Sequence, residues 1–112
     1  MKKTYFLAVL FFFIAFSVFA APLKIIFKNS TGYEIVEIYI SPSNSDDWGD
    51  DYLAGASLND GRSFTVTLNP SAGEKNLYDV QLVDIEGYTY SQYDIPVKND
   101  TIIEFTSDDL DK

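Results

Sequence analysis

Four carboxylates stand close together in one short polar segment of the chain. Asp46, Asp47, Asp50 and Asp51 flank Trp48-Gly49, and this Trp is the only one in the sequence. Calcium binds six to eight oxygen atoms, which clustered carboxylates and loop carbonyl groups supply. Gly49 permits a tight bend that brings the two aspartate pairs together. The four residues are therefore a candidate calcium site, although their spacing is not that of an EF-hand loop. The alternative is a solvated loop whose aspartates bond their own backbone.

Aromatic and acidic side chains supply a second candidate, a binding surface for a ligand or partner. Aromatic faces beside carboxylates suit sugar rings or cationic side chains. The alternative is that the tyrosines pack across strands and that the Trp closes one end of the fold. The residues of this candidate surface come from two expected strands and from both sides of the acidic loop: Tyr33, Glu37, Tyr39, Trp48, Tyr52, Tyr88 and Tyr90.

The chain contains no His and no Cys. Most zinc and copper sites are thereby excluded, and so are hydrolases that use a Cys nucleophile or a Ser–His pair. A glycosidase with paired carboxylates needs a cleft that desolvates one of them, and a small sandwich offers none. We expect a protein that is not an enzyme and that binds no cofactor other than the calcium considered above. A small hydrolase is the least favoured alternative.

The first 20 residues have the pattern of a secretory signal peptide. Lys2 and Lys3 precede an uncharged, Phe-rich segment, and Val18-Phe19-Ala20 suits the cleavage positions. Cleavage after Ala20 would leave 92 of the 112 residues, enough for one domain with a modest core. A retained membrane anchor is the alternative. We expect an exported protein, periplasmic or secreted, with no membrane attachment after cleavage.

The expected mature chain is strongly acidic. It keeps all 17 Asp and Glu and loses Lys2 and Lys3 from the eight basic residues, which leaves a formal charge of −11. Such a surface repels nucleic acid and anionic lipid. A protein or glycan partner is compatible with it.

The elements that must position these residues are strands. Apolar residues alternate with polar ones, as in Leu23, Ile25 and Phe27, which predicts a half-buried strand. Five further strands are expected at 33–41, with Val36, Ile38 and Ile40 inward, and at 63–68, 78–84, 88–93 and 101–106. Ile85-Glu86-Gly87 predicts a tight hairpin turn, and Pro96 interrupts or borders the sheet. Residues 52–58 could form a short edge strand or a crossing.

Six or seven short antiparallel strands predict an immunoglobulin-like β-sandwich over residues 21–106. A small, partly open β-barrel is the alternative. Residues 107–112 are expected to form an exposed acidic tail. The expected core contains six apolar side chains from four strands: Phe64, Val66, Val80, Leu82, Ile103 and Phe105.

Three motifs resemble a group of small exported bacterial β domains. They are Asn29-Ser-Thr-Gly-Tyr-Glu-Ile, then Tyr39-Ile-Ser-Pro-Ser-Asn-Ser-Asp-Asp-Trp-Gly-Asp-Asp, and then Tyr78-Asp-Val-Gln-Leu-Val-Asp-Ile-Glu-Gly. The resemblance covers most of the expected mature chain and implies an exported β domain, with no particular activity. Together with the residues, it favours a binding or interaction module. A calcium-stabilised structural domain of the periplasm or cell surface is the alternative.

Overall fold

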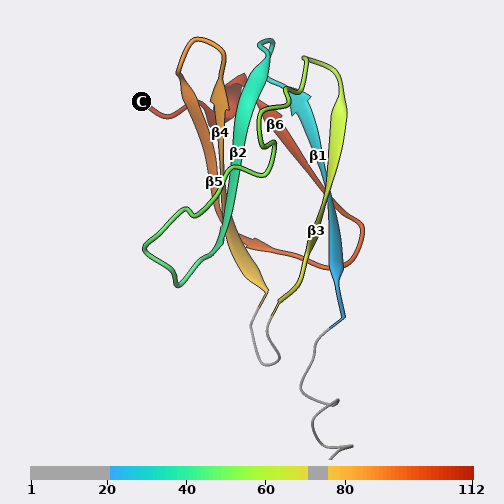
Figure 1. Ribbon diagram of the computed structural model, residues 1–112. Helices are drawn as coiled ribbons and strands as arrows, with labels where there is room; N and C mark the ends of the chain where they lie inside the picture. Colours follow the sequence, from blue (N-terminus) through green and yellow to red (C-terminus); the bar gives the residue numbers. More distant parts are fainter. Residues whose placement is uncertain (1–20, 71–75) are drawn as a thin grey trace, which may run out of the picture.

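The protein is an open sandwich of two three-stranded sheets (Figure 1). The computed structural model describes residues 21–70 and 76–112, so the expected signal peptide lies outside the described residues. The strands are β1 (Leu23–Ser30), β2 (Ile35–Pro42), β3 (Ser63–Leu68), β4 (Leu77–Asp84), β5 (Thr89–Pro96) and β6 (Thr101–Thr106). The predicted β-sandwich is confirmed, and the sheets do not close into a barrel.

The strands are ordered β3–β1–β6 in one sheet and β2–β4–β5 in the other. The pairs β1–β3, β2–β4 and β4–β5 are antiparallel, as predicted, whereas β1 and β6 run parallel. The expectation of an all-antiparallel sandwich is therefore wrong for this one pair, because the period-two pattern fixes faces but not strand direction.

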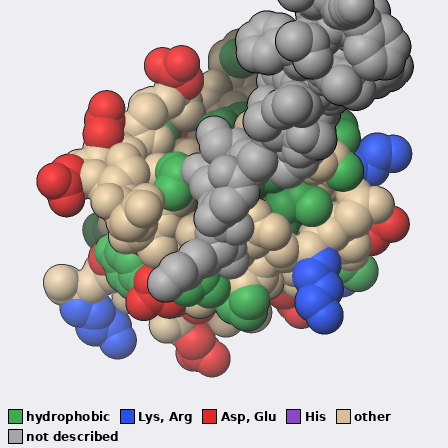
Figure 2. Space-filling view, turned by 90° about the horizontal axis from the view of Figure 1, so that it is seen from below, with side chains coloured by type: hydrophobic (Ala, Val, Ile, Leu, Met, Phe, Trp, Pro, Cys, Tyr) green, Lys and Arg blue, Asp and Glu red, His purple; other side chains and the backbone are tan. Residues whose placement is uncertain are grey.

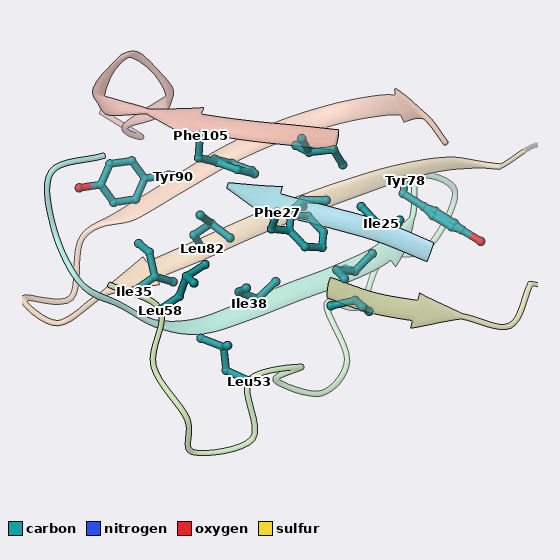
Figure 3. Close-up of a cluster of buried hydrophobic side chains, with 14 of the residues drawn as sticks. Ile25, Phe27, Ile35, Ile38, Leu53, Leu58, Tyr78, Leu82, Tyr90 and Phe105 are labelled. Carbon is teal, nitrogen blue, oxygen red and sulfur yellow. The ribbon is translucent and has the colours of Figure 1, made fainter. Parts of the chain in front are cut away.

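The core lies between the two sheets and is made by alternate residues of the strands (Figure 3). Phe27 and Phe105 are fully buried in it, and Tyr78 and Tyr90 lie toward its opposite ends. Of the expected core, Val66, Val80, Leu82, Ile103 and Phe105 are buried.

Phe64 is only partly buried, which corrects the prediction that it belongs to the buried core. It pairs with Phe27, which occupies the interior position instead. β3 is an edge strand, so Phe64 has a strand neighbour on one side only.

A register shift between Ile35 and Glu37 changes the faces of β2. Ile35 is buried and Val36 is only half-buried, the reverse of the prediction. An extra residue in one strand reverses the alternation at that point, which the composition of the segment does not reveal. Ile38 and Ile40 are buried, as expected.

The C-terminal segment is held against the sheet rather than forming a free tail. A 3₁₀ turn, η1 (Ser107–Asp109), begins with a capping box between Thr106 and Asp109. Leu110 forms a β-bridge with Tyr90, and the Asp111 N–H donates to the Thr89 carbonyl at 2.8 Å. The expected exposed tail is thus partly wrong, because its aspartates bond neighbouring backbone and hydroxyl groups.

Pro96 lies within β5 and ends it, opposite Leu77. β5 is an edge strand, where a missing N–H costs no ladder bond. The irregular position is Asp94, whose φ is 54°, beside a register shift in the β4–β5 pair. Over the described ranges 21–70 and 76–112, no helix is long and apolar enough to span a membrane.

Candidate functional site

The outward side of the β2–β4–β5 sheet carries three of the residues that the sequence analysis favoured for binding, Glu37, Tyr39 and Trp48. Tyr39, Gln81 and Ser91 lie side by side on the three strands, in register. Their neighbours along the strands, Ile38, Leu82 and Tyr90, point into the core. Because successive side chains alternate across a sheet, Tyr39, Gln81 and Ser91 face outward. We call this surface the outer face of the β2–β4–β5 sheet.

Glu37 and Tyr39 form a fixed pair on the outer face. The Tyr39 hydroxyl donates to Glu37 Oε1 at 2.7 Å. This hydrogen bond, together with desolvation and the negative charges of Glu37 and Asp51, raises the pKa of Tyr39 to about 12. The phenol therefore keeps its proton at neutral pH, and its ring is oriented before any ligand arrives. The two predicted residues are brought together as expected.

Trp48 contacts Tyr93, a residue that the sequence analysis did not assign to the surface. The two ring centroids are 6.4 Å apart and the planes are tilted by 43°. Tyr93 lies two residues after Ser91 on β5, hence on the same side of the sheet, and it is 60% exposed. Figure 1 shows the loop after β2 running out beside this sheet and back. Trp48 therefore extends the outer face and does not close an end of the core.

Hydrogen-bonding groups lie between and beside the aromatic rings. The Gln81 side chain donates to the Ser91 hydroxyl at 3.4 Å, a long contact. The hydroxyls of Thr89 and Ser91 both donate to Asp111 Oδ2 at 2.7 Å. The C-terminal segment thus contributes a carboxylate to the rim of the outer face, where the sequence alone indicated only an acidic tail.

The four aspartates of the loop play different parts. Asp51 Oδ1 accepts hydrogen bonds from the N–H groups of Ile38 and Leu53, both at 2.9 Å. Asp47 Oδ1 accepts from the Gly49 N–H at 3.2 Å, while Asp46 and Asp50 are exposed. Within the described ranges, no three Asp or Glu side chains are placed to hold a metal ion together. The geometry resembles the alternative of a loop whose carboxylates bond the backbone.

Of the remaining predicted surface residues, Tyr33 and Tyr88 do not join the outer face. Tyr33 and Tyr88 are exposed at the end of the sandwich where the β4–β5 turn meets the segment before β2. Tyr52 is exposed beside the outer edge of β2, where its N–H donates to the Ile38 carbonyl at 2.8 Å. Tyr33 and Tyr88 are therefore separated from the Glu37–Tyr39 pair, whereas the backbone of Tyr52 lies beside Ile38, the residue between Glu37 and Tyr39.

Tyr90 is a correction to the predicted surface, because it is only 2% exposed. It lies opposite Leu82 in the β4–β5 ladder, and its hydroxyl donates to Asp84 Oδ2 at 2.8 Å. Burial, followed by the hydrogen bond and charge of Asp84, raises the pKa of Tyr90 to about 12. The burial of Tyr90 could have been predicted from the sequence. The hairpin turn places Tyr90 opposite Leu82, which was predicted to point inward, and residues opposite each other share a face.

Asp84 and Asn29 are buried polar residues that each form several hydrogen bonds, and the sequence analysis did not single them out. Asp84 is 1% exposed, and its Oδ1 accepts from the N–H groups of Glu86 and Tyr88 at 2.9 and 3.0 Å. Gly87 completes this turn at a φ of 91°, which favours glycine. The spacing Asp84-x-x-Gly87 was the available signal, because Asp commonly accepts bonds from the backbone of a turn.

Asn29 explains the first motif of the sequence. Its side-chain amide donates to the carbonyls of Tyr33 and Leu58, at 2.7 and 3.0 Å. Its Oδ1 accepts from the N–H and the hydroxyl of Thr31, at 3.0 and 2.7 Å. The amide is therefore fully bonded in the interior and joins two loops. This motif has a structural role.

Charge is distributed unevenly over the surface. Figure 2 views the end of the sandwich where β1 begins; hydrophobic side chains lie toward its middle, and both acidic and basic ones stand at the rim. Lys24 and Lys28 are on β1, in the other sheet from the outer face. The acidic loop and the carboxylates of Glu37 and Asp111 give the outer face its negative character.

No protein-family model matches the chain, and no curated protein or solved structure matches it significantly. The resemblance to small exported domains thus receives no support from these comparisons, and any function is inferred from the geometry described above.

Proposed function

We propose that this protein is an exported, non-enzymatic binding module whose ligand contacts the outer face of the β2–β4–β5 sheet. One observation carries the proposal: the hydrogen-bonded pair Glu37–Tyr39 and the aromatic pair Trp48–Tyr93 belong to the same side of one sheet. Aromatic rings with carboxylates and hydroxyls beside them suit sugar rings or cationic side chains.

The face is suited to binding because part of it is already ordered. Glu37 fixes the Tyr39 ring, and the Ser91 hydroxyl is fixed by Asp111. Side chains held in place before binding lose less conformational entropy when a ligand arrives. Trp48 is half-buried and Tyr93 is exposed, so the second pair offers accessible ring surface.

The arrangement of carboxylates favours binding over catalysis. Asp84 is the only buried Asp or Glu of the described residues, and its two oxygens accept three hydrogen bonds from the hairpin. It is thus engaged in holding a turn. The other carboxylates are partly or wholly exposed to water, which is a poor setting for general acid catalysis.

A calcium-stabilised structural domain is a weaker alternative. Asp51 would have to share or give up its bonds to Ile38 and Leu53 in order to bind an ion through the same oxygen. Asp46 and Asp50 remain available, but two exposed carboxylates fall short of the six to eight oxygen ligands that calcium takes.

Export is the second part of the proposal and has its own test. The basic start, the apolar segment and Val18-Phe19-Ala20 support it. N-terminal sequencing of the protein made by its cell should find Ala21 first. A membrane-bound product that still begins at Met1 would replace cleavage by anchoring.

The binding test uses two tyrosines of similar exposure. Tyr93 is 60% exposed on the outer face, and Tyr88 is 58% exposed at the end of the sandwich. The purified protein is screened against immobilised glycans and against basic peptides. For any ligand found, Trp48→Ala and Tyr93→Ala should each weaken binding about tenfold, which corresponds to about 1.4 kcal/mol. Tyr88→Ala should leave the affinity unchanged.

The screen also separates the two ligand classes. Affinity for a basic peptide should fall as salt is added, since mobile ions screen exposed charges. Affinity for a neutral glycan should change little. Equal losses for Tyr88→Ala and Tyr93→Ala would refute the assignment of the face, as would a ligand whose affinity survives both outer-face variants.

A further inference from the structure

The sandwich has four strand edges, and at three of them named groups bond part of the outward backbone. An uncovered edge presents a row of N–H and C=O groups that can pair with another strand. At the edge of β2, Asp51 Oδ1 accepts from the Ile38 N–H, and the Tyr52 N–H donates to the Ile38 carbonyl. Leu58 forms a two-way bridge with Ile35 at the start of the same strand.

The edges of β5 and β6 are covered in part by side chains and by the C-terminal segment. The Asp111 N–H donates to the Thr89 carbonyl, and Pro96 has no N–H to offer. On β6, the Gln92 side chain donates to the Glu104 carbonyl at 2.9 Å. Asp109 Oδ2 accepts from the Thr106 N–H at 2.9 Å.

β3 is the fourth edge. Partners in an antiparallel ladder alternate between hydrogen-bonded and non-bonded pairs. The Asn29 N–H donates to the Arg62 carbonyl, so the backbone groups of Phe64 and Val66 face β1 by the same alternation. Those of Ser63, Thr65 and Thr67 therefore face away from the sheet. Within residues 21–70 and 76–112, no group forms a hydrogen bond to them.

We propose that β3 pairs antiparallel with β3 of a second copy of this chain, centred on Thr65. This register places Thr65 opposite Thr65 of the second copy and Ser63 opposite its Thr67. The residues that supply outward backbone groups are also the exposed ones of β3, with Ser or Thr side chains. The same register therefore pairs the outward backbone groups and places Ser and Thr side chains opposite one another, because residues opposite each other share a face of the sheet.

The second copy also suits the apolar side of β3. In this register Phe64 lies opposite Val66 of the second copy, so apolar side chains continue across the junction. Phe64 is the partly buried member of the strand, while Val66 and Leu68 are buried. Pairing would give Phe64 the strand neighbour that it lacks on its free side.

The distribution of charge favours this edge over the rest of the surface. The chain carries a formal charge of −9, so two copies repel one another overall. β3 has no charged residue, and the nearest charges along its sheet are basic: Arg62 precedes it, and Lys24 and Lys28 pair with Thr67 and Ser63. The acidic loop belongs to the other sheet. Because β3 itself is uncharged, its pairing with a second β3 sets no charged side chain directly opposite another.

This inference goes beyond the proposed ligand face and does not depend on it, since it concerns the opposite sheet. The test is the mass of the purified protein in solution as a function of concentration, measured by sedimentation. We expect a monomer–dimer equilibrium. Thr65→Pro removes an N–H that makes no bond within the chain, so the variant should fold and remain monomeric. Its thermal unfolding is measured beside that of the wild type.

Two lysine variants keep the test decisive if Thr65→Pro does not fold. Thr65→Lys would set two like charges opposite each other at the centre of the pairing and should weaken the dimer several-fold or more. Ile102→Lys adds the same charge at a side chain that is 67% exposed on β6, in the same sheet, and should leave dimerisation unchanged. A wild-type protein that is monomeric at all concentrations would overturn the proposal. Equal effects of the two lysines would also overturn it.

Because the chain contains no Cys, a single introduced Cys reports on the register. Thr65→Cys should give a covalent dimer with a short thiol cross-linker, and Ile102→Cys should not. Cross-linking of both variants to the same extent would indicate random collision and refute strand pairing.

Discussion

Two turns of the same sheet use the carboxylates of aspartate in opposite ways. Asp84, after β4, is buried and accepts three hydrogen bonds. In the loop after β2, Asp46 and Asp50 stand in water. Local composition drew attention to the second turn, where four aspartates gather. The difference teaches that a carboxylate acquires a structural role where unpaired N–H groups converge on it, and density of charge is a poor guide to that.

The largest effect should come from the buried turn. Asp84→Ala removes the acceptor of the Tyr90 hydroxyl and of the Glu86 and Tyr88 N–H groups. Hydrogen bonds to charged groups contribute about 1.5–3 kcal/mol each, and part of the loss is recovered by water, so we expect about 3–5 kcal/mol of destabilisation. Urea unfolding measures it. Asp46→Ala is the matched control. Similar urea midpoints for the two variants would contradict the structural role of Asp84 relative to the exposed Asp46.

Tyr90→Phe tests the buried hydrogen bond between Tyr90 and Asp84 by removing its donor. It leaves Asp84 Oδ2 without its donor and should cost about 1–3 kcal/mol at neutral pH. The pKa of Tyr90 is raised from 10.0 to about 12 in the folded protein. A raised pKa contributes stability that is complete below pH 10 and is lost as the pH rises toward 12.

The wild type and Tyr90→Phe should therefore differ most below pH 10, and the difference should shrink above it. Chemical unfolding at a series of pH values measures this directly. If the difference in unfolding free energy between the two proteins grew as the pH rose, the direction of the Tyr90 pKa shift would be wrong. The buried hydrogen bond between Tyr90 and Asp84 would then be misassigned as well.

Neighbouring residues of the loop offer a smaller but closely matched comparison. Asp51→Ala frees the N–H groups of Ile38 and Leu53 and should cost about 1–3 kcal/mol. Asp50→Ala should change the unfolding free energy by no more than about 0.5 kcal/mol, as for most exposed positions. Differential scanning calorimetry of both variants gives the comparison. Equal shifts in melting temperature would contradict the hydrogen bonds assigned to Asp51.

The smallest effect is expected for the double variant Asp46→Asn with Asp50→Asn. Neither carboxylate makes a described contact, so stability should stay within about 0.5 kcal/mol of the wild type. Calcium at about 10⁻³ M, the range of weak extracellular sites, should leave Trp48 fluorescence unchanged in both proteins. A wild-type response that the double variant lacks would restore the calcium hypothesis.

The strands could be read from the sequence because their chemistry is local. Val80 and Leu82 alternate with Asp79 and Gln81, and a half-buried strand follows from that spacing alone. The same reasoning failed at Ile35, since a single extra residue reverses the alternation beyond it. It also failed at Phe64, whose burial depends on whether another strand lies beside β3.

The candidate site was only partly predictable, because it is assembled from distant segments. Glu37 and Tyr39 are two residues apart on one strand, so their pairing was foreseeable. Trp48 and Tyr93 belong to a loop and to a later strand, and nothing local links them. Asp111 reaches the outer face because the C-terminal segment folds back on β5, which an acidic composition gives no reason to expect.

The parallel pairing of β1 with β6 has a consequence for how the chain folds. β1 is the central strand of its sheet, and its two partners are β3 and the last strand of the protein. Pairs such as Lys28 with Glu104 join segments far apart in the sequence, which slows folding because a long loop must close first. At about 5–20 residues per second of synthesis, β1 waits several seconds for β6 to be made. The first strand to emerge is thus held without its full set of neighbours until nearly the whole chain exists.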